Sequence, residues 1–193
     1  MLNPEKRQAI LESATEIFLE KGLYRAKVEE IAEKAGIAKG TVYLYFKSKR
    51  QIFLAVFQQH LEGYFAEIEH LLSLKETAAH KLLILIRFHL SQIGSFAKLV
   101  YPDVHSEPFQ WDDEMFKEVL GVQRRVQGAF ARILEQGMHE GVFRPVDALH
   151  AALCLQGILR IHLESALLQT DPNWPDEELS QKIYDLFVQG LEK

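Results

Sequence analysis

One stretch of the sequence indicates the architecture most clearly: Val28-Glu-Glu-Ile-Ala-Glu-Lys-Ala-Gly-Ile-Ala-Lys-Gly-Thr-Val-Tyr-Leu-Tyr-Phe46. Apolar residues recur at helical spacing on both sides of Gly36, which predicts one helix over 28–35 and another over 40–46. Gly36 can adopt the left-handed backbone conformation that a sharp turn between them requires. Two short helices packed across such a turn are typical of a helix-turn-helix. We expect a small core where they meet, formed by Ile31, Ala32, Ile37 and Val42.

The remainder of the chain repeats the helical period, and no alternating run indicates a strand, so we predict an all-α fold. Pro4 suits a first helical turn and Gly22 a helix end, which predicts a helix over 4–21. A long helix should begin after Ser48, which can form a capping box with Gln51. Further helices are predicted over 76–96, 112–140, 146–168 and 175–191. We place a domain boundary at the start of the long helix, giving a three-helix head over 1–47 and a helical body over 48–193.

Composition fits an ordinary globular protein. The 193 residues are 48% hydrophobic and 25% charged, which is enough apolar material for a sizeable core. The first residues lack the pattern of a secretory signal, and the most apolar later stretch, 148–168, carries too many polar residues to cross a bilayer. We therefore expect a cytoplasmic protein with no membrane segment. Cys154 is the only cysteine, and we expect it to be a small buried hydrophobic residue.

Charge is distributed unevenly along the chain. Residues 1–50 carry ten Lys or Arg against seven Glu, a net charge of +3. Because the whole chain has a net charge of −5, the remaining residues carry −8. A basic head on an acidic body favours approach to nucleic acid by the head, because phosphates repel the body. We expect the second helix of the motif to expose a DNA-reading face ringed by lysines, consisting of Lys39, Gly40, Thr41, Tyr43 and Tyr45 with Lys47 and Lys49 beside it.

Four segments in the first 57 residues resemble the N-terminal signature of the TetR family of bacterial repressors: Ala9-Ile-Leu-Glu-Ser-Ala14, Ile17-Phe-Leu-Glu-Lys-Gly22, Ile31-Ala-Glu-Lys-Ala-Gly36 and Lys39-Gly-Thr-Val-Tyr-Leu-Tyr-Phe-Lys-Ser-Lys49. The resemblance implies a DNA-binding domain over 1–47 and a ligand-binding and dimerisation domain over 48–193. It further implies a homodimeric repressor that binds double-stranded operator DNA and is released by a small effector.

The resemblance also implies individual roles at the DNA. Lys39 and Lys49 match positions that contact phosphates, and Tyr43 and Tyr45 match positions that face DNA. Thr41 and Leu44 can reach base edges or a thymine methyl group, whereas Val42 and Phe46 fit the core better. The alternative for each tyrosine is simple packing. The DNA-binding residues we predict are Lys27, Lys39, Gly40, Thr41, Tyr43, Leu44, Tyr45 and Lys49.

Two positions depart from the family pattern. Ala26-Lys27 replaces a usual pair of hydroxyl residues, and Ala38 replaces a serine that caps the second helix of the motif. Each lost cap costs about 1 kcal/mol and removes a possible hydroxyl–phosphate hydrogen bond. We expect Arg25 and Lys27 to replace that contact with charge.

The body mixes apolar residues with a few polar ones, which suits either an apolar pocket or a filled core. The segments 51–67 and 119–134 resemble the fatty-acid-degradation repressors of the family, whose inducer is a long-chain acyl-CoA. An acyl chain would need an apolar tunnel, and Arg124 or Arg160 could bind its phosphates. The predicted ligand-binding residues are Phe65, Phe88, His89, Arg124, Gln127, Phe130, Gln156 and Arg160.

Two apolar seams in the last helices suit dimerisation, although each could instead face its own core. One seam comprises Leu149, Leu153, Gly157 and Ile161, and the other Leu179, Ile183, Leu186, Phe187 and Leu191. A two-fold dimer would bind half-sites about 34–36 Å apart, hence a palindromic operator.

Enzymatic and metal-binding signals are weak. No catalytic triad, phosphate loop or metalloprotease motif occurs, the histidine spacings do not suit a metal, and adjacent carboxylates such as Glu29-Glu30 fit a solvated helix surface. We therefore expect no catalysis and no cofactor. Two alternatives to a ligand-relieved repressor remain open at this point: a metabolite-binding protein or enzyme with a vestigial helix-turn-helix, and a DNA-binding activator or architectural protein without an inducer.

Overall fold

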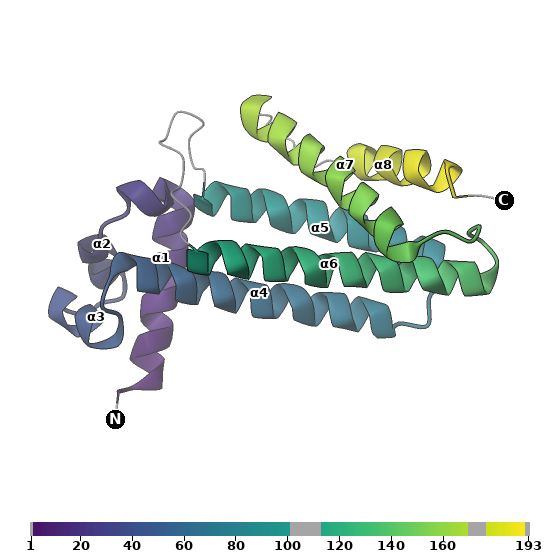
Figure 1. Cartoon of the computed structure of the whole chain (residues 1–193). Coiled ribbons are helices and arrows are strands. Elements are labelled where there is room, and N and C mark those ends of the chain that lie inside the picture. Colours follow the sequence, from purple (N-terminus) through teal and green to yellow (C-terminus); the bar gives the residue numbers. More distant parts are fainter. Residues whose placement is uncertain (1, 101–112, 170–176, 192–193) are drawn as a thin grey trace. The chain divides into compact units, whose positions relative to one another are not determined.

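The structure, a computed structural model, describes residues 2–100, 113–169 and 177–191. Within these ranges the chain forms eight α-helices and no strand (Figure 1), which confirms the predicted fold class. Their bounds are α1 Pro4–Arg25, α2 Val28–Lys34, α3 Lys39–Tyr45, α4 Lys49–Ser73, α5 Ala78–Val100, α6 Asp113–Glu140, α7 Ala148–Gln169 and α8 Glu177–Gln189.

The described residues fall into two compact units. The first contains 2–65 and 96–100, and the second contains 66–95, 113–169 and 177–191. Helix α4 begins in the first unit and ends in the second, so a single continuous helix belongs to both. The functional boundary at residue 47, where the helix-turn-helix should end, stays a prediction.

Helix α1 begins as the sequence predicts and ends later. The Asn3 side-chain oxygen accepts hydrogen bonds from the backbone N–H groups of Glu5 (2.7 Å) and Lys6 (3.4 Å), which caps the helix in front of Pro4. Gly22 takes a left-handed φ of 73° and kinks the helix there. The predicted end at Lys21 is wrong, because the chain resumes helical geometry after the kink and continues to Arg25.

The helix-turn-helix core forms as expected. Gly36 has a φ of 66°, and the Ile37 N–H donates to the carbonyl of Ala32 across the turn at 3.0 Å. Ile31 and Val42 are fully buried, whereas Ile37 is half-buried. Burying branched aliphatic side chains on both helices fixes the angle at which α3 leaves α2.

The start of α4 carries a modified capping box. The Ser48 hydroxyl accepts from the Gln51 N–H at 3.2 Å, as predicted. The Gln51 side-chain oxygen accepts from the Lys47 N–H at 2.7 Å, one residue before the position that a standard capping box uses. These two hydrogen bonds fix the residue at which α4 begins.

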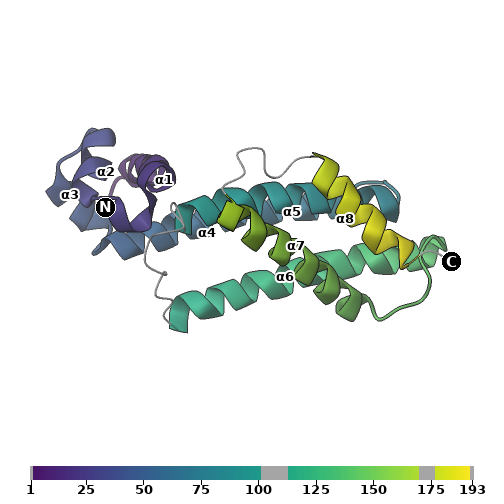
Figure 2. The same ribbon diagram turned by 90° about the horizontal axis from the view of Figure 1, so that it is seen from above.

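In the second unit, α7 crosses α6 and contacts α8 (Figures 1 and 2). Two glutamine side chains link α6 to α7 through backbone carbonyls. Gln127 Nε2 donates to the carbonyl of Leu149 at 2.9 Å, and Gln156 Nε2 donates to the carbonyl of Gln123 at 3.1 Å. Because each amide satisfies a main-chain acceptor, the pair holds the two helices in one register.

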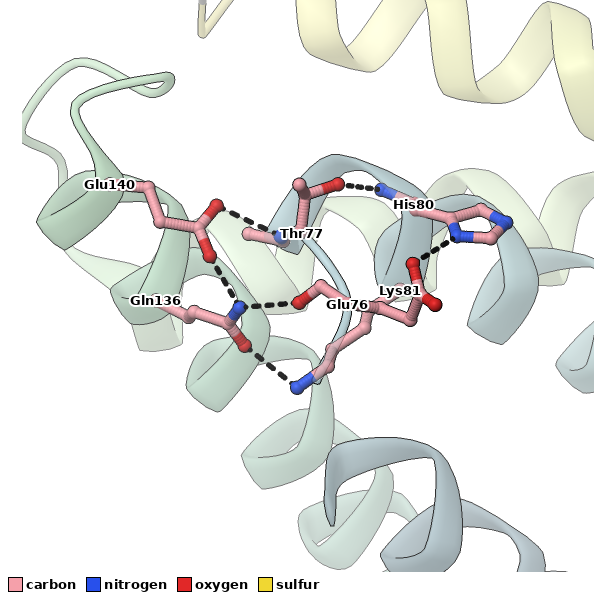
Figure 3. Close-up of polar contacts among 7 residues, drawn as sticks. Glu76, Thr77, His80, Lys81, Gln136 and Glu140 are labelled. Atoms are coloured by element: carbon pink, nitrogen blue, oxygen red, sulfur yellow. Dashed lines mark hydrogen bonds and ion pairs between the residues drawn. The ribbon is translucent and has the colours of Figure 1, made fainter. Parts of the chain in front are cut away.

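A polar network joins the end of α4, the start of α5 and the end of α6 (Figure 3). The buried Lys81 ammonium donates to the carbonyl of Leu72 at 2.9 Å and to the Gln136 side-chain oxygen at 3.0 Å. Gln136 Nε2 donates in turn to the carbonyl of Glu76 and to the Glu140 carboxylate. The second Glu140 oxygen accepts from the Ala78 N–H at 3.0 Å, which lowers the pKa of that carboxyl. The network gives a buried cation hydrogen-bonding partners and fixes the corner between α4 and α5.

Candidate functional site

Helix α3 turns its small apolar residues inward and its predicted DNA-reading residues outward. Val42 and Phe46 are buried, as expected. Tyr43 is 39% exposed and Leu44 is 61% exposed, although both are large and apolar enough to favour burial. Lys39 and Gly40 are also exposed, and Thr41 is half-buried. The outer face of α3 therefore offers one hydroxyl, one phenol, one aliphatic group and one cation to a ligand.

The cation at the start of α3 has a partner on α2. Lys39 Nζ lies 2.5 Å from Glu29 Oε1 and 5.8 Å from the centre of the Tyr43 ring. The hydrogen bond with Glu29 raises the pKa of Lys39 and lowers the pKa of Glu29. Both side chains are therefore charged at neutral pH, and Lys39 meets solvent as one half of an ion pair.

Tyr45 is held by the first residues of the chain. Its phenol oxygen accepts a hydrogen bond from the Asn3 N–H at 3.0 Å, and its side chain is half-buried. Next to it, the Arg7 guanidinium lies 5.4 Å from the centre of the Phe46 ring. These contacts tie α3 to the start of α1 and leave Tyr45 less exposed than Tyr43.

Lys49 contacts main-chain carbonyls. Its ammonium donates to the carbonyls of Tyr24 and Ala26, at 3.0 Å each, and partial burial lowers its pKa. An ammonium has three donors, so the two bonds leave one for a phosphate. Lys27 is exposed at the position before α2.

The two departures from the family pattern have visible consequences. Neither α2 nor α3 has a side-chain cap at its first residue, as expected from Lys27 and Ala38 at the N-cap positions. The Glu30 carboxylate compensates in part for α2, because it accepts from the Lys27 N–H at 3.1 Å. Ala26 is only 2% exposed, so a phosphate contact at that position is not available to its side chain.

Sequence reasoning missed the ion pairs that two carboxylates of α2 form with lysines of α1 and α3. Glu29 is exposed, as expected, and Glu30 is half-buried, but Glu29 also binds Lys39 and Glu30 binds Lys21 at 2.9 Å. These partners lie ten and nine residues away along the chain, beyond the i,i+4 spacing that reveals ion pairs within one helix. Only the packing of α1, α2 and α3 brings them together.

The predicted ligand-binding residues divide into buried and exposed groups. His89 and Phe130 lie together in the second unit, with ring centres 5.9 Å apart in an edge-to-face arrangement. Burial lowers the pKa of His89 to about 4, so the imidazole is neutral at pH 7. Phe88 is half-buried, whereas Arg124 and Arg160 are exposed.

The other predicted ligand-binding residues have different surroundings. The half-buried Gln127 and Gln156 are engaged between α6 and α7 by the carbonyl contacts described above. Phe65 is buried in the first unit, where its ring centre lies 5.0 Å from that of Tyr64. Their roles toward a ligand stay predictions.

A groove between α1 and α4 in the first unit has a volume of about 380 Å³. It is lined by Glu12, Thr15, Glu16, Val56, Gln59 and His60. The two carboxylates disfavour an anionic ligand such as an acyl-CoA. This groove therefore fits the predicted effector poorly.

The first predicted dimerisation seam is exposed. Leu149, Leu153 and Ile161 of α7 are 56%, 54% and 60% exposed. Cys154 is exposed on the same helix, so its predicted burial within the chain is wrong. The reason is that this face of α7 points away from its own core, whereas Ala152 and Leu155 point into it.

The second predicted seam is split. Ile183 and Leu191 are buried within the unit, Leu179 and Phe187 are half-buried, and Leu186 is 67% exposed. Most of this seam faces its own core, which was the stated alternative. Among its described residues, α8 thus exposes one large apolar side chain.

Comparison with known proteins agrees with this arrangement. Residues 10–56, which span α2, α3 and the turn between them, match the bacterial regulatory proteins of the tetR family. The chain therefore carries an N-terminal domain that is similar to those of the TetR family. Its relatives are TetR-family transcriptional regulators, which are not enzymes.

Three similar proteins extend the match beyond the head. The fatty acid metabolism regulator protein of Bacillus subtilis strain 168 is 27% identical over 188 residues, covering 96% of this chain and 95% of the relative. The structure of the transcriptional regulator FadR from Bacillus subtilis in complex with stearoyl-CoA is 25% identical, with a TM-score of 0.75 and coverage of 96% and 99%. The fatty acid degradation regulator FadR from Bacillus halodurans is also 25% identical, with a TM-score of 0.77 and coverage of 99% and 98%. The chain is therefore related to regulators of fatty acid metabolism.

Two kinds of feature are absent from the part of the chain that the structure describes. There, no three His, Cys, Asp or Glu side chains gather where they could hold a metal ion. In the same residues, no helix is long and apolar enough to cross a membrane.

Proposed function

We propose that this chain is a homodimeric repressor that binds a palindromic operator in double-stranded DNA and is released by a long-chain acyl-CoA. The observation that carries the DNA-binding part is the outer face of α3, where Tyr43 and Leu44 are exposed beside Lys39 while Val42 and Phe46 anchor the helix. An exposed phenol and an exposed aliphatic group suit base edges and thymine methyl groups, and the lysine suits phosphate.

Selection from random duplexes tests this part. The purified protein should enrich an inverted repeat, and the affinity for it should fall steeply as salt is raised. Replacing both Lys39 and Tyr43 by alanine should abolish the enrichment. Unchanged affinity in the double variant would remove α3 from the proposed interface, and no enrichment by the natural protein would favour a vestigial helix-turn-helix.

The acyl-CoA part rests on the similarity to FadR from Bacillus subtilis, whose structure contains stearoyl-CoA, and on the character of the second unit. That unit buries His89 against Phe130 and exposes Arg124 and Arg160. A neutral buried imidazole can form a hydrogen bond with the polar end of an acyl chain. Exposed guanidinium groups can bind the phosphates of a CoA moiety.

Release of bound operator tests the effector. Stearoyl-CoA should displace the DNA, whereas free CoA and stearate should be at least tenfold less effective, since each provides only one of the two recognised chemistries. Mass spectrometry of small molecules released from the purified protein gives an independent identification. If no acyl-CoA displaces the DNA and none co-purifies, an activator or architectural role without an inducer replaces this proposal.

Helix α4 is the natural element for communication, because it starts next to the helix-turn-helix and ends in the unit that holds His89 and Phe130. An effector releases DNA only if it binds the DNA-incompetent conformation more tightly than the competent one. We propose that acyl-CoA binding moves α4 and thereby changes the separation of the two recognition helices of the dimer.

A further inference from the structure

The contact between Glu29 and Lys39 lies within the proposed DNA interface. Glu29 is the second residue of α2 and Lys39 is the first residue of α3, so their ion pair spans the turn of the motif. The two side chains remain 57% and 49% exposed, which leaves both within reach of an approaching phosphate. The ammonium also lies over the ring of Tyr43, a residue that the proposed function places at the bases.

We propose that Glu29 is a specificity-determining positioning residue, which holds Lys39 over Tyr43 and weakens binding to non-operator DNA more than binding to the operator. The inference rests on the proposed function, because it requires that α3 bind DNA. Glu29 acts through Lys39 and needs no contact of its own with a base.

Charge explains why non-operator DNA is affected most. Binding to an arbitrary duplex relies on phosphate contacts alone, and each contact adds to the counterion release that drives association. A lysine already neutralised by a carboxylate gains little from a phosphate, since the phosphate must either displace Glu29 or approach it against like-charge repulsion. The ion pair thus removes one effective cation from non-specific binding.

On the operator, base contacts by α3 hold the helix in one position. The Lys39 ammonium has three donors, so it can bind Glu29 and one phosphate together when the geometry is fixed. Glu29 then orients the Lys39 ammonium. The carboxylate therefore weakens the phosphate contact less on the operator than on non-operator DNA. The difference between the two complexes increases the specificity ratio.

Glu29→Gln tests the inference, with Glu33→Gln as the matched control. Glu33 is an exposed carboxylate of the same helix, so both variants change the net charge by the same amount. Affinities are measured on the selected operator and on a scrambled duplex of equal length across a salt series. We expect Glu29→Gln to tighten binding to the scrambled duplex about fivefold more than Glu33→Gln does. Its salt slope on that duplex should steepen by about 1.8, equivalent to one added phosphate contact for each subunit of the proposed dimer.

Operator affinity should change less than twofold beyond the control, and in a Lys39→Gln background the two glutamate substitutions should have equal effects. Equal effects of the two single variants on the scrambled duplex overturn the inference while leaving the proposed function intact. Persistence of the Glu29 effect without Lys39 also overturns it. Weaker binding to both duplexes, accompanied by a lower melting temperature, assigns Glu29 a purely structural role. A natural protein that prefers no duplex overturns the proposed function itself.

Discussion

Some side chains in this protein lie in surroundings that their chemistry disfavours: an apolar side chain is exposed to solvent, and a titratable one is buried. Leu44 belongs to the first kind and His89 to the second. An exposed leucine on α3 forgoes the stabilisation of burial, and a buried imidazole loses the solvation of its charged form. Both are therefore places where a substitution should have a measurable and specific effect.

His89→Phe should flatten the dependence of stability on pH. Burial lowers the pKa of His89 from 6.5 to about 4, so the native state favours the neutral ring. Its contribution is fully present above pH 6.5 and is lost as the pH falls toward 4, a loss of about 3 kcal/mol over that window. Urea unfolding at pH 7 and pH 4.5 measures the difference between the natural protein and the variant. Parallel pH profiles for the two proteins would contradict the prediction.

Leu44→Ala should weaken operator binding by about thirtyfold, because a buried thymine-methyl contact is worth about 1 kcal/mol and the proposed dimer would make one in each half-site. The matching change on the DNA is thymine to uracil, which deletes the methyl group alone. In each half-site, we expect one thymine whose replacement by uracil weakens binding of the natural protein about fivefold and does not weaken binding of the variant further. Additive effects at every thymine would show that Leu44 contacts no methyl group.

At the scale of helices, the ends and corners hold the second unit together. Gln136 links the buried Lys81 to the loop before α5 and to Glu140 at the end of α6 (Figure 3). After α6, Gly141 takes a φ of 74° and the chain folds back so that Phe143 packs over Gly137. Both arrangements join segments that a helical pattern alone leaves unconnected.

Gln136→Leu should destabilise the protein by about 2 kcal/mol, since it removes one hydrogen bond from the buried Lys81 ammonium, which keeps its bond to Leu72, and one from the Glu76 carbonyl. Glu135→Leu is the matched control, because the neighbouring side chain is exposed on the same helix. Denaturant unfolding of both variants at pH 7 measures the difference. Equal stabilities would mean that the network adds nothing to the corner.

Gly137→Ala should destabilise the protein by about 1–3 kcal/mol, because a Cβ at this position would overlap the ring of Phe143, which is 2% exposed. Gly128→Ala on the same helix has open space around the added methyl group. That control should gain up to about 1 kcal/mol from helix propensity. A melting temperature that rises in both variants would show that Phe143 moves aside without cost.

At the scale of the whole molecule, we propose that the exposed apolar residues of α7, together with Leu186 of α8, form the interface of the proposed dimer. Isolated exposed leucines are ordinary in monomers, but three large aliphatic side chains along one helix face favour an interface. In a two-fold dimer the same face of α7 would contact its own copy.

Leu153→Glu should dissociate the dimer, since it would place two like charges in a desolvated interface. Light scattering should give the mass of one chain, and operator affinity should fall at least a hundredfold because only one half-site is bound at a time. Gln189→Glu, which adds the same charge at an exposed position of α8, serves as the control for altered charge. A monomeric natural protein, or a dimeric variant, would contradict the assignment of this face.

Features that depend on local order could be predicted from the sequence. Helical periodicity, the left-handed glycine at 36 and the burial of Ile31 and Val42 all involve residues within a few turns of one another. Tertiary structure alone decided which faces are covered: it paired Glu29 with Lys39, engaged Gln127 and Gln156 between two helices, and left Cys154 exposed. The physical reason is that a helical pattern specifies which residues share a face, but only the packing of distant segments decides what that face meets.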